Sequence, residues 1–304
     1  MPNIARFGTG PERARVAIVG CGGAGCNTLR HVVVPPNAER IAVNDEPHPS
    51  MAGIPRRVFV RPDSLRAFAT MDERAVQKME THEEKDLATA LLDRDVVLVL
   101  GGLGGDLGGW GASLVGRVAS ILGDLTVVFV TVPFTAEGML RRETAEAQLD
   151  LLRTKADGVV AFSNDHLLRL APDLPIAKSF AVLGAIMARA ASGLAAVVAR
   201  DDVVPIRRFL ARSRDWRFGI GTGTEKHRCF VAVDEAYRSP WFTGRHGDIR
   251  QAVVIIAHPA SRGLEGEILH EIHLRSPLAD LEWAADPRPT EGDRVVVQIL
   301  AGLA

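Results

Sequence analysis

The sequence predicts an α/β protein with a doubly wound parallel sheet, a long central helix and a smaller α+β C-terminal unit. Short runs that are continuously apolar after a charged first residue, such as 15–19 and 95–100, alternate with longer amphipathic segments. Strands covered by helices on both faces have this continuous pattern. Residues 177–199 are apolar on nearly every face, which is typical of a helix buried between two layers.

Composition limits the classes of protein to consider. The 304 residues are 47% hydrophobic and 24% charged, enough for two domains. Lys and Arg total 36 and Asp and Glu total 37, so the net charge of −1 gives no electrostatic case for nucleic acid as a partner. We expect no transmembrane segment, because charges or glycines interrupt every apolar run before about 18 residues. Three cysteines are too few for a disulfide framework, and we expect a cytoplasmic protein.

Strands and helices alternate along the first half of the chain. We expect helices at about 25–33, 83–94 and 112–122, where apolar residues follow helical spacing. We expect strands where short apolar runs end in glycine, proline or polar residues, at 15–19, 39–45, 95–100, 125–134 and 157–165.

The second unit begins near Trp216 and contains three runs with strand composition, at 230–237, 252–259 and 294–300. The HEIH stretch (270–273) also resembles a strand, which would place His270 and His273 on opposite sides. We therefore expect no metal site there. Cys21 and Cys26 have no second Cys or His pair nearby, so we expect no metal at that point either.

Glycines cluster after the first strand, in GCGGAG (20–25). They satisfy G-x-G-x-x-G before a helix, and Asp45 ends the next strand. This pattern fits a dinucleotide such as NAD, whose pyrophosphate would lie at the helix N-terminus. Glycines that serve tight packing alone are the other interpretation.

A second glycine loop, GGLGGDLGGWG (101–111), favours a different ligand. It also follows a strand and precedes a helix, so backbone N–H groups of both loops could face one anionic chain, as a triphosphate requires. An NAD-dependent oxidoreductase remains the weaker alternative, because Tyr237 is the sole tyrosine and no catalytic His, Lys and Tyr set is evident.

Several segments, in order, resemble the tubulin/FtsZ superfamily, and FtsZ more closely than tubulin. The chain is identified by this resemblance as a divergent FtsZ-like protein. The segments are GCGGAGCN (20–27), VND (43–45), GGLGGDLGG (101–109), TVPFTAEGMLRR (131–142), SNDHLL (163–168), FGIGTGTEKHRCFVAVDEAYRSPWF (218–242) and RVVVQILAGLA (294–304). In the sixth segment the family has a G-x-G motif followed by a helix.

The resemblance implies GTP or GDP as the ligand, with Mg²⁺ as a possible companion, and head-to-tail association into a homo-oligomer or filament. It also implies a domain division. We expect an N-terminal extension (1–13), a GTP-binding domain (14–176), a central helix (177–199), a loop and connecting helix (200–215) and an activation-type domain (216–304).

The resemblance also assigns roles to single residues. Glu137 would contact the ribose, Arg141 the sugar and phosphates, and Asn164 the base. Two simpler interpretations stay open: Glu137 and Arg141 could be a helix-surface ion pair, and Asn164 with Asp165 could only cap a helix. The nucleotide-binding set on the glycine loops and beside them is Gly22, Gly23, Cys26, Asn27, Asn44, Gly104, Gly105, Asp106, Leu107 and Gly108.

Two departures from the family pattern affect the nucleotide site. Asp106 and Leu107 replace Gly-Thr in the second loop, and a carboxylate about 4 Å from a phosphate would cost ~4 kcal/mol before screening. Asp106 could instead point away or bind phosphate through Mg²⁺. Phe180 stands where FtsZ has an Asp that reads guanine, so we expect a weak preference for GTP over ATP.

A third departure affects hydrolysis. FtsZ carries two acidic residues after the central helix, which polarise the attacking water of the neighbouring subunit. Asp202 matches the first, Pro205 matches the second, and Asp201 could substitute after a one-residue slip. We expect weak or absent GTP hydrolysis, since a lost water-positioning group commonly costs about 10²–10⁴ in rate.

The sequence stops at Ala304, just past the last predicted strand, and we expect no C-terminal peptide that recruits membrane anchors. The leading interpretation is a GTP-binding, cytoskeletal-type protein that self-associates head-to-tail. The alternative is a tubulin-like scaffold that has given up the nucleotide.

Overall fold

The computed structural model describes residues 13–61, 65, 82–199, 203–259, 263–286, 288, 290 and 292–303. Its strands are β1 (Val16–Cys21), β2 (Ala38–Asn44), β3 (Arg56–Phe59), β4 (Val96–Gly102), β5 (Leu125–Val132), β6 (Gly158–Ser163), β7 (Asp215–Gly223), β8 (Ile249–Ala257), β9 (Asp280–Ala285) and β10 (Val295–Leu303). Its helices are α1 (Gly22–Leu29), α4 (His82–Leu91), α5 (Gly111–Leu122), α6 (Met139–Lys155), α7 (Asn164–Leu170), α8 (Ile176–Val198), α9 (Val203–Leu210), α10 (Arg228–Arg238) and α11 (Glu265–Arg275).

The described strands form one sheet in the order β3-β2-β1-β4-β5-β6-β7-β10-β8-β9. Pairing is parallel from β3 to β7 and antiparallel on both sides of β10. The predicted α/β class with a mostly parallel sheet is therefore confirmed. β3, β7 and β9 were not predicted. β6 ends at Ser163, so the last two residues of the strand predicted at 157–165 belong to α7.

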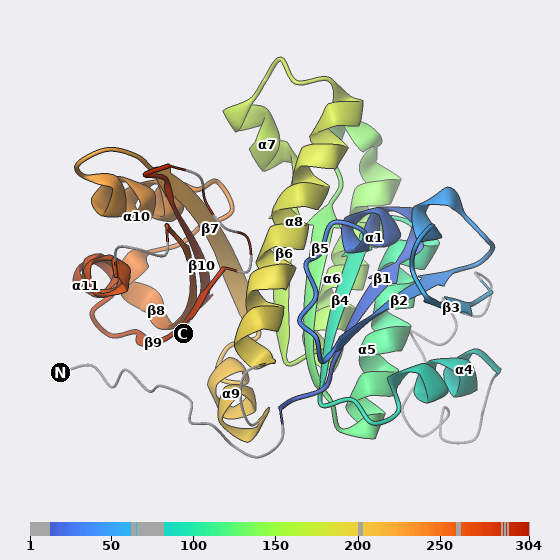
Figure 1. The fold of residues 1–304 in the computed structure, drawn as a ribbon. Helices are drawn as coiled ribbons and strands as arrows, with labels where there is room; N and C mark the ends of the chain where they lie inside the picture. Colours follow the sequence, from blue (N-terminus) through green and yellow to red (C-terminus); the bar gives the residue numbers. More distant parts are fainter. Residues whose placement is uncertain are drawn as a thin grey trace.

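Helices cover both faces of the parallel part of the sheet. α1 and α8 lie on one face, and α4, α5 and α6 lie on the other (Figure 1). In β1, Val16 and Ile18 pack into the core on the α8 side, while Ala17 and Val19 pack into the core on the α5 side. Burial on both faces explains why the strand is apolar at every position.

The long central helix predicted at 177–199 is α8, and it packs between the parallel sheet and the C-terminal strands. Leu183 and Leu194 share one core with Val253 of β8 and Leu300 of β10. In the described part of the chain, α8 alone is long and apolar enough to cross a membrane, and 61% of its most apolar stretch is buried inside the fold. This burial is that of a core helix.

The strand predicted at 230–237 is wrong, because these residues lie in α10. Cys229, Ala232, Val233 and Ala236 are buried, a spacing of three and one that matches one face of a helix, while Phe230 is half exposed. β-branched and aromatic residues suggested a strand, but the helix that the family resemblance implied is the one present.

The strand predicted for 270–273 is also wrong. These residues lie in α11, whose buried side is made by Ile268, Leu269 and Ile272. His270 and His273 are therefore one helical turn apart rather than on opposite faces. Among the described residues there is no group of three or more His, Cys, Asp or Glu side chains that could hold a metal ion.

The N-terminal and C-terminal parts of the sheet meet where β6 pairs with β7 through Val159 and Val160. The predicted extension (1–13) lies outside the described residues except for Arg13. The predicted boundaries at residues 176, 199 and 215 stay predictions.

We expect Gly25→Ala to lower the free energy of unfolding by at least about 2 kcal/mol, because a Cβ at Gly25 would lie 2.2 Å from the carbonyl oxygen of Leu100 in β4. Gly116→Ala is the matched control. It lies inside α5, where the nearest atom to a Cβ would be 4.0 Å away, so we expect it to raise stability by up to about 1 kcal/mol. Urea unfolding measures both, and equal effects would contradict the close approach of α1 to β4.

Candidate nucleotide site

The two glycine loops lie side by side at the carboxyl edge of the sheet. β1 and β4 are neighbouring parallel strands, and Cys21 at the end of β1 pairs with Gly101. Gly22 begins α1 directly after β1. After β4, the chain passes through a π-helical turn, Asp106–Trp110, into α5. Two helix N-termini therefore open at one edge, where unpaired N–H groups and the helix dipoles favour an anion.

Because glycine has no side chain, the backbone segments of the glycine loops can lie very close to one another. A Cβ at Gly108 would lie 2.0 Å from the carbonyl oxygen of Gly102, and a Cβ at Gly20 would lie 2.7 Å from that of Gly25. Gly22 has φ +65° and its backbone is close to Gly108, so the two loops contact each other. Gly20 and Gly108 are thus required by close backbone approach within their own loops, and Gly22 by the contact between the loops.

Two other glycines leave the backbone open. No atom lies within 4 Å of a Cβ placed at Gly23 or Gly105, and both residues line the cavity between the loops. A Cβ there would occupy space that a phosphate group could otherwise fill. This is the feature that fits a phosphorylated ligand rather than simple packing.

The cavity between the loops has a volume of about 290 Å³. Ten of the predicted nucleotide-binding residues line it. They are Gly22, Gly23, Gly105, Asp106, Leu107, Gly108, Glu137, Arg141, Asn164 and Phe180. These residues come from both glycine loops, from the segment after β5 and from the starts of α6, α7 and α8, so the structure brings together segments that lie far apart in the sequence.

Glu137 and Arg141 do form the ion pair that we considered as an alternative, with Arg141 Nε 3.2 Å from Glu137 Oε2. The other Glu137 oxygen accepts a hydrogen bond from the Phe134 backbone N–H at 2.8 Å. Both side chains nevertheless line the cavity. The pair is thus held at the cavity wall and is compatible with a ligand contact.

Asn164 is the first residue of α7 and is 3% exposed. Its Oδ1 has no hydrogen-bond partner among the described residues, although it is buried. Ser163 occupies the N-cap position, so Asn164 is not the cap. A buried, unpaired amide oxygen at the cavity wall is the kind of group that a ligand donor would satisfy.

The adjacent Asp165 belongs to a network at the same edge. Its carboxylate accepts hydrogen bonds from the backbone N–H of Thr135 at 3.0 Å and from the Thr135 hydroxyl at 2.6 Å. Partial burial raises the pKa of Asp165, but the Thr135 hydrogen bonds and the charge of Arg142 outweigh that effect and lower its pKa overall. The ionised carboxylate fixes α7 to the segment that follows β5.

A second cavity of about 460 Å³ adjoins the first, and Ala24, Thr131 and Phe180 line both. Asn27 and His31 line this second cavity, and no carboxylate is among its described lining residues. Phe180 is 48% exposed and its ring packs edge-on against Phe134, with centroids 5.7 Å apart. An aromatic face is therefore available where the family pattern has an acid.

Three predicted residues do not line either cavity. Cys26 is fully buried, its thiol donates to the Gly20 carbonyl oxygen at 3.2 Å, and burial raises its pKa to about 11. Asn44 is buried at the end of β2, and its Oδ1 has no partner among the described residues. Gly104 has φ +86° and its backbone lies against Arg141.

The predicted catalytic residues Asp201 and Asp202 lie outside the described residues. Pro205 is described, exposed and in the first turn of α9. α9 follows the far end of α8 from the cavity (Figure 1). No residue of α9 therefore lies at the cavity of its own chain.

Sequence reasoning missed Gln148. This side chain of α6 is fully buried, accepts a hydrogen bond from the Gly104 N–H at 2.8 Å and donates to the Gly105 carbonyl oxygen at 3.0 Å. It thereby holds the second glycine loop from behind. The signal was present in the sequence, because Ala145, Gln148 and Leu152 are spaced three and four apart and form the buried side of α6.

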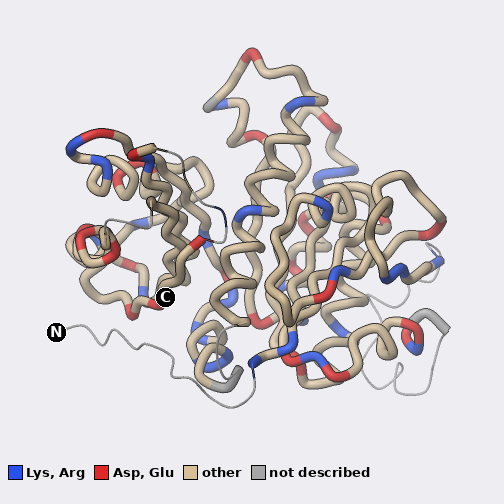
Figure 2. The backbone as a smooth tube through the Cα atoms, in the orientation of Figure 1, with Lys and Arg blue, Asp and Glu red and all other residues tan. Residues whose placement is uncertain are grey.

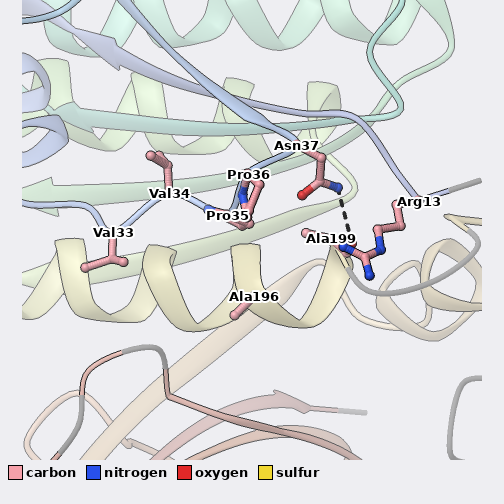
Figure 3. A pocket seen from close by; sticks show the side chains of 8 residues that line it. All are labelled: Arg13, Val33, Val34, Pro35, Pro36, Asn37, Ala196 and Ala199. Atoms are coloured by element: carbon pink, nitrogen blue, oxygen red, sulfur yellow. Dashed lines mark hydrogen bonds between the residues drawn. The ribbon is translucent and has the colours of Figure 1, made fainter.

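A third cavity, of about 360 Å³, lies between the 33–37 segment and the last turns of α8 (Figure 3). Its lining is mostly aliphatic, from Val33, Pro35 and Ala196. The Asn37 side-chain amide donates a hydrogen bond to the carbonyl oxygen of Ala199 at 3.2 Å. This third cavity lacks the glycine backbone and the paired helix N-termini of the first cavity. The first cavity therefore remains the candidate site.

Comparison with known proteins gives matches over nearly the whole chain. Residues 15–172 match the family described as "Tubulin/FtsZ family, GTPase domain". The chain is 30% identical over 286 residues to the cell division protein FtsZ of Methanothermobacter thermautotrophicus, which covers 90% of this chain and 75% of that protein. It is 29% identical over 299 residues to cell division protein FtsZ 1 of Pyrococcus abyssi, covering 95% and 80%.

Two solved structures share the fold. An empty FtsZ dimer from M. jannaschii superposes with a TM-score of 0.83 at 24% identity, covering 96% of this chain and 88% of that one. CetZ2 from Haloferax volcanii, solved as a GTPγS-bound protofilament, superposes with a TM-score of 0.71 at 17% identity, covering 95% and 93%.

We expect Gln148→Leu to lower the free energy of unfolding by about 1–3 kcal/mol, because it leaves backbone groups of Gly104 and Gly105 without their partner. Glu143→Ala, at an exposed position of the same helix, is the control and should change it by less than about 0.5 kcal/mol. Urea denaturation of both variants tests this, and a Gln148→Leu variant as stable as the control would show that the amide does not hold the loop.

Proposed function

The chain belongs to the tubulin/FtsZ family, and we propose that it binds GTP or GDP between its two glycine loops and associates head-to-tail in the cytoplasm, with weak or absent hydrolysis. One observation carries the proposal. Two helix N-termini and the open backbone of Gly23 and Gly105 face a single cavity. That arrangement suits a chain of phosphates, and a dinucleotide site needs only one such loop.

The residues present fit a nucleotide with its phosphates in the first cavity and its base toward the second. The helix N-termini and loop N–H groups would hold the phosphates, Glu137 and Arg141 would face the sugar, and Asn164 would satisfy its unpaired Oδ1 on the nucleotide. Mg²⁺, if bound, would neutralise phosphate charge beside Asp106, the carboxylate that lines the phosphate cavity.

The proposal of weak hydrolysis rests on the residues that follow the C-terminal end of α8. Aligned on the downstream FGIG segment, Pro205 stands where FtsZ has the second water-polarising acid, and proline offers no side-chain acceptor. A bound nucleotide would then act mainly as a conformational and assembly ligand rather than as a substrate that turns over rapidly.

Calorimetric titration with GTP, ATP and NAD, each with Mg²⁺, tests the proposed ligand. We expect GTP to bind at micromolar or lower Kd and NAD not to compete. We expect ATP to bind less than about a hundredfold more weakly than GTP, because Phe180 cannot accept hydrogen bonds from guanine. A thousandfold preference for GTP would show that the base is read elsewhere. Binding of none of the three would favour the nucleotide-free scaffold.

We expect Phe180→Asp to raise the preference for GTP over ATP by about tenfold, since it restores a hydrogen-bond acceptor at the base. Phe180→Ala is the control, because it removes the ring without adding an acceptor and should weaken both nucleotides alike. The same competition titration measures the ratio, and an unchanged ratio in Phe180→Asp would remove this residue from the base site.

We expect Pro205→Asp to raise the rate of GTP hydrolysis, because it supplies the second acid. The substitution is at an exposed position in the first turn of α9, where an acid also suits the helix dipole. Pro205→Ala controls for loss of the proline. Phosphate release is the measurement, and an unchanged rate in a variant that still forms filaments would contradict the alignment of this loop.

A further inference from the structure

The proposed phosphate cavity contains an uncompensated carboxylate. Asp106 is exposed and lines the cavity, so its charge adds to that of any bound phosphates. The arginines on the adjacent helix already have carboxylate partners: Arg141 pairs with Glu137 at 3.2 Å and Arg142 with Glu146 at 3.3 Å. Within the described residues, Asp106 makes no ion pair with an arginine or lysine of its own chain.

A cation of suitable exposure lies at the opposite pole of the molecule. α8 has 23 residues and is therefore about 34 Å long, with Phe180 of the cavity near its start and α9 beyond its end (Figure 1). Lys and Arg residues mark α9 in Figure 2. The cavity and α9 thus lie too far apart to meet within one chain.

Of the two arginines of α9, Arg208 is the one whose side chain is available to contact another molecule. It is exposed, and it lies three residues after Pro205, so the two share one face of the helix. Its neighbour Arg207 is occupied, because its guanidinium donates to the Gly123 carbonyl oxygen. Arg208 makes no hydrogen bond or ion pair with any residue that the structure describes.

Both poles also expose large apolar side chains. Met139 and Leu140 are 77% and 78% exposed and lie in the sequence between Glu137 and Arg141, two residues that line the cavity. Ile121 is 70% exposed at the end of α5, next to the Gly123 carbonyl that Arg207 of α9 contacts. Each pole therefore exposes both a charged and a large apolar side chain, and the two charges, Asp106 and Arg208, have opposite sign.

We propose that Arg208 of one copy pairs with Asp106 of the next copy when the chain associates head-to-tail. This inference rests on the association in the proposed function and names the charge pair that directs it. The two surfaces differ, so the contact repeats from copy to copy instead of closing on itself. The guanidinium offsets the charge of Asp106 beside the phosphates, which makes association favour nucleotide binding and nucleotide binding favour association.

A charge swap tests the pairing. With GTP and Mg²⁺ at low salt, Arg208→Asp and Asp106→Arg should each raise the concentration needed for association by at least about tenfold, measured by analytical ultracentrifugation. The double variant Asp106→Arg/Arg208→Asp should return to within about threefold of the unchanged protein. Arg250→Asp, at an exposed position of β8, is the control and should associate normally.

The remaining outcomes decide between the pairing and the broader proposal. If the unchanged protein associates but the double variant is no better than the weaker single variant, the pairing is wrong and head-to-tail association stands. If Asp106→Arg raises the concentration needed for association by the same factor in the unchanged protein and in Arg208→Asp, Asp106 acts through Mg²⁺ and the pairing is also wrong. An unchanged protein that stays monomeric at all concentrations with bound GTP would overturn both. Calorimetric titration of Arg208→Asp should show unaltered GTP binding to its monomer.

Discussion

Close backbone approach of both glycine loops to β4 is the constraint on which the rest of the site depends. α1 approaches β4 closely enough at Gly25 that even a methyl group would strike the Leu100 carbonyl, and the second loop folds back on β4 at Gly108 in the same way. These contacts place two helix N-termini at one edge of the sheet. The cavity between them and its open backbone at Gly23 and Gly105 follow from that placement, which is the arrangement that the proposed phosphate site needs.

The sequence predicted the parallel sheet, the central helix and most of the cavity wall, because each has a strong local signal. Strands buried on both faces are continuously apolar, α8 is apolar all round, and glycines at strand ends mark close backbone approach. Prediction failed where composition and spacing disagreed. Residues 230–237 have strand-forming side chains, but burial of Ala232, Val233 and Ala236 fixes them as a helix.

Tertiary contacts account for what the sequence could not show. Gln148 holds the second loop from a helix more than forty residues away, and a glutamine on a polar helix gives little sign of that role. Cys26 belongs to the first glycine segment, yet its side chain points into the core rather than the cavity, because it lies on the buried side of α1. Asp201 and Asp202 lie outside the described residues, and their roles stay predictions.

Each of the three departures from the family pattern changes the charge at one of two places, the cavity or α9. Asp106 adds a negative charge at the phosphate cavity, Phe180 removes one from the base, and Pro205 removes one from the opposite pole, where Arg208 is exposed. Under the proposed function, these changes would weaken base selectivity and hydrolysis while nucleotide-linked association is kept.

Hydrogen exchange of the backbone amides, with and without GTP and Mg²⁺, tests the central claim most directly, because it reports on each loop separately. If one nucleotide lies between the two loops, GTP should slow exchange in peptides that contain Gly22–Gly23 and in peptides that contain Gly105–Asp106, at the same ligand concentration. Protection of the first loop alone would indicate a site of the dinucleotide type and would contradict a ligand held between the two.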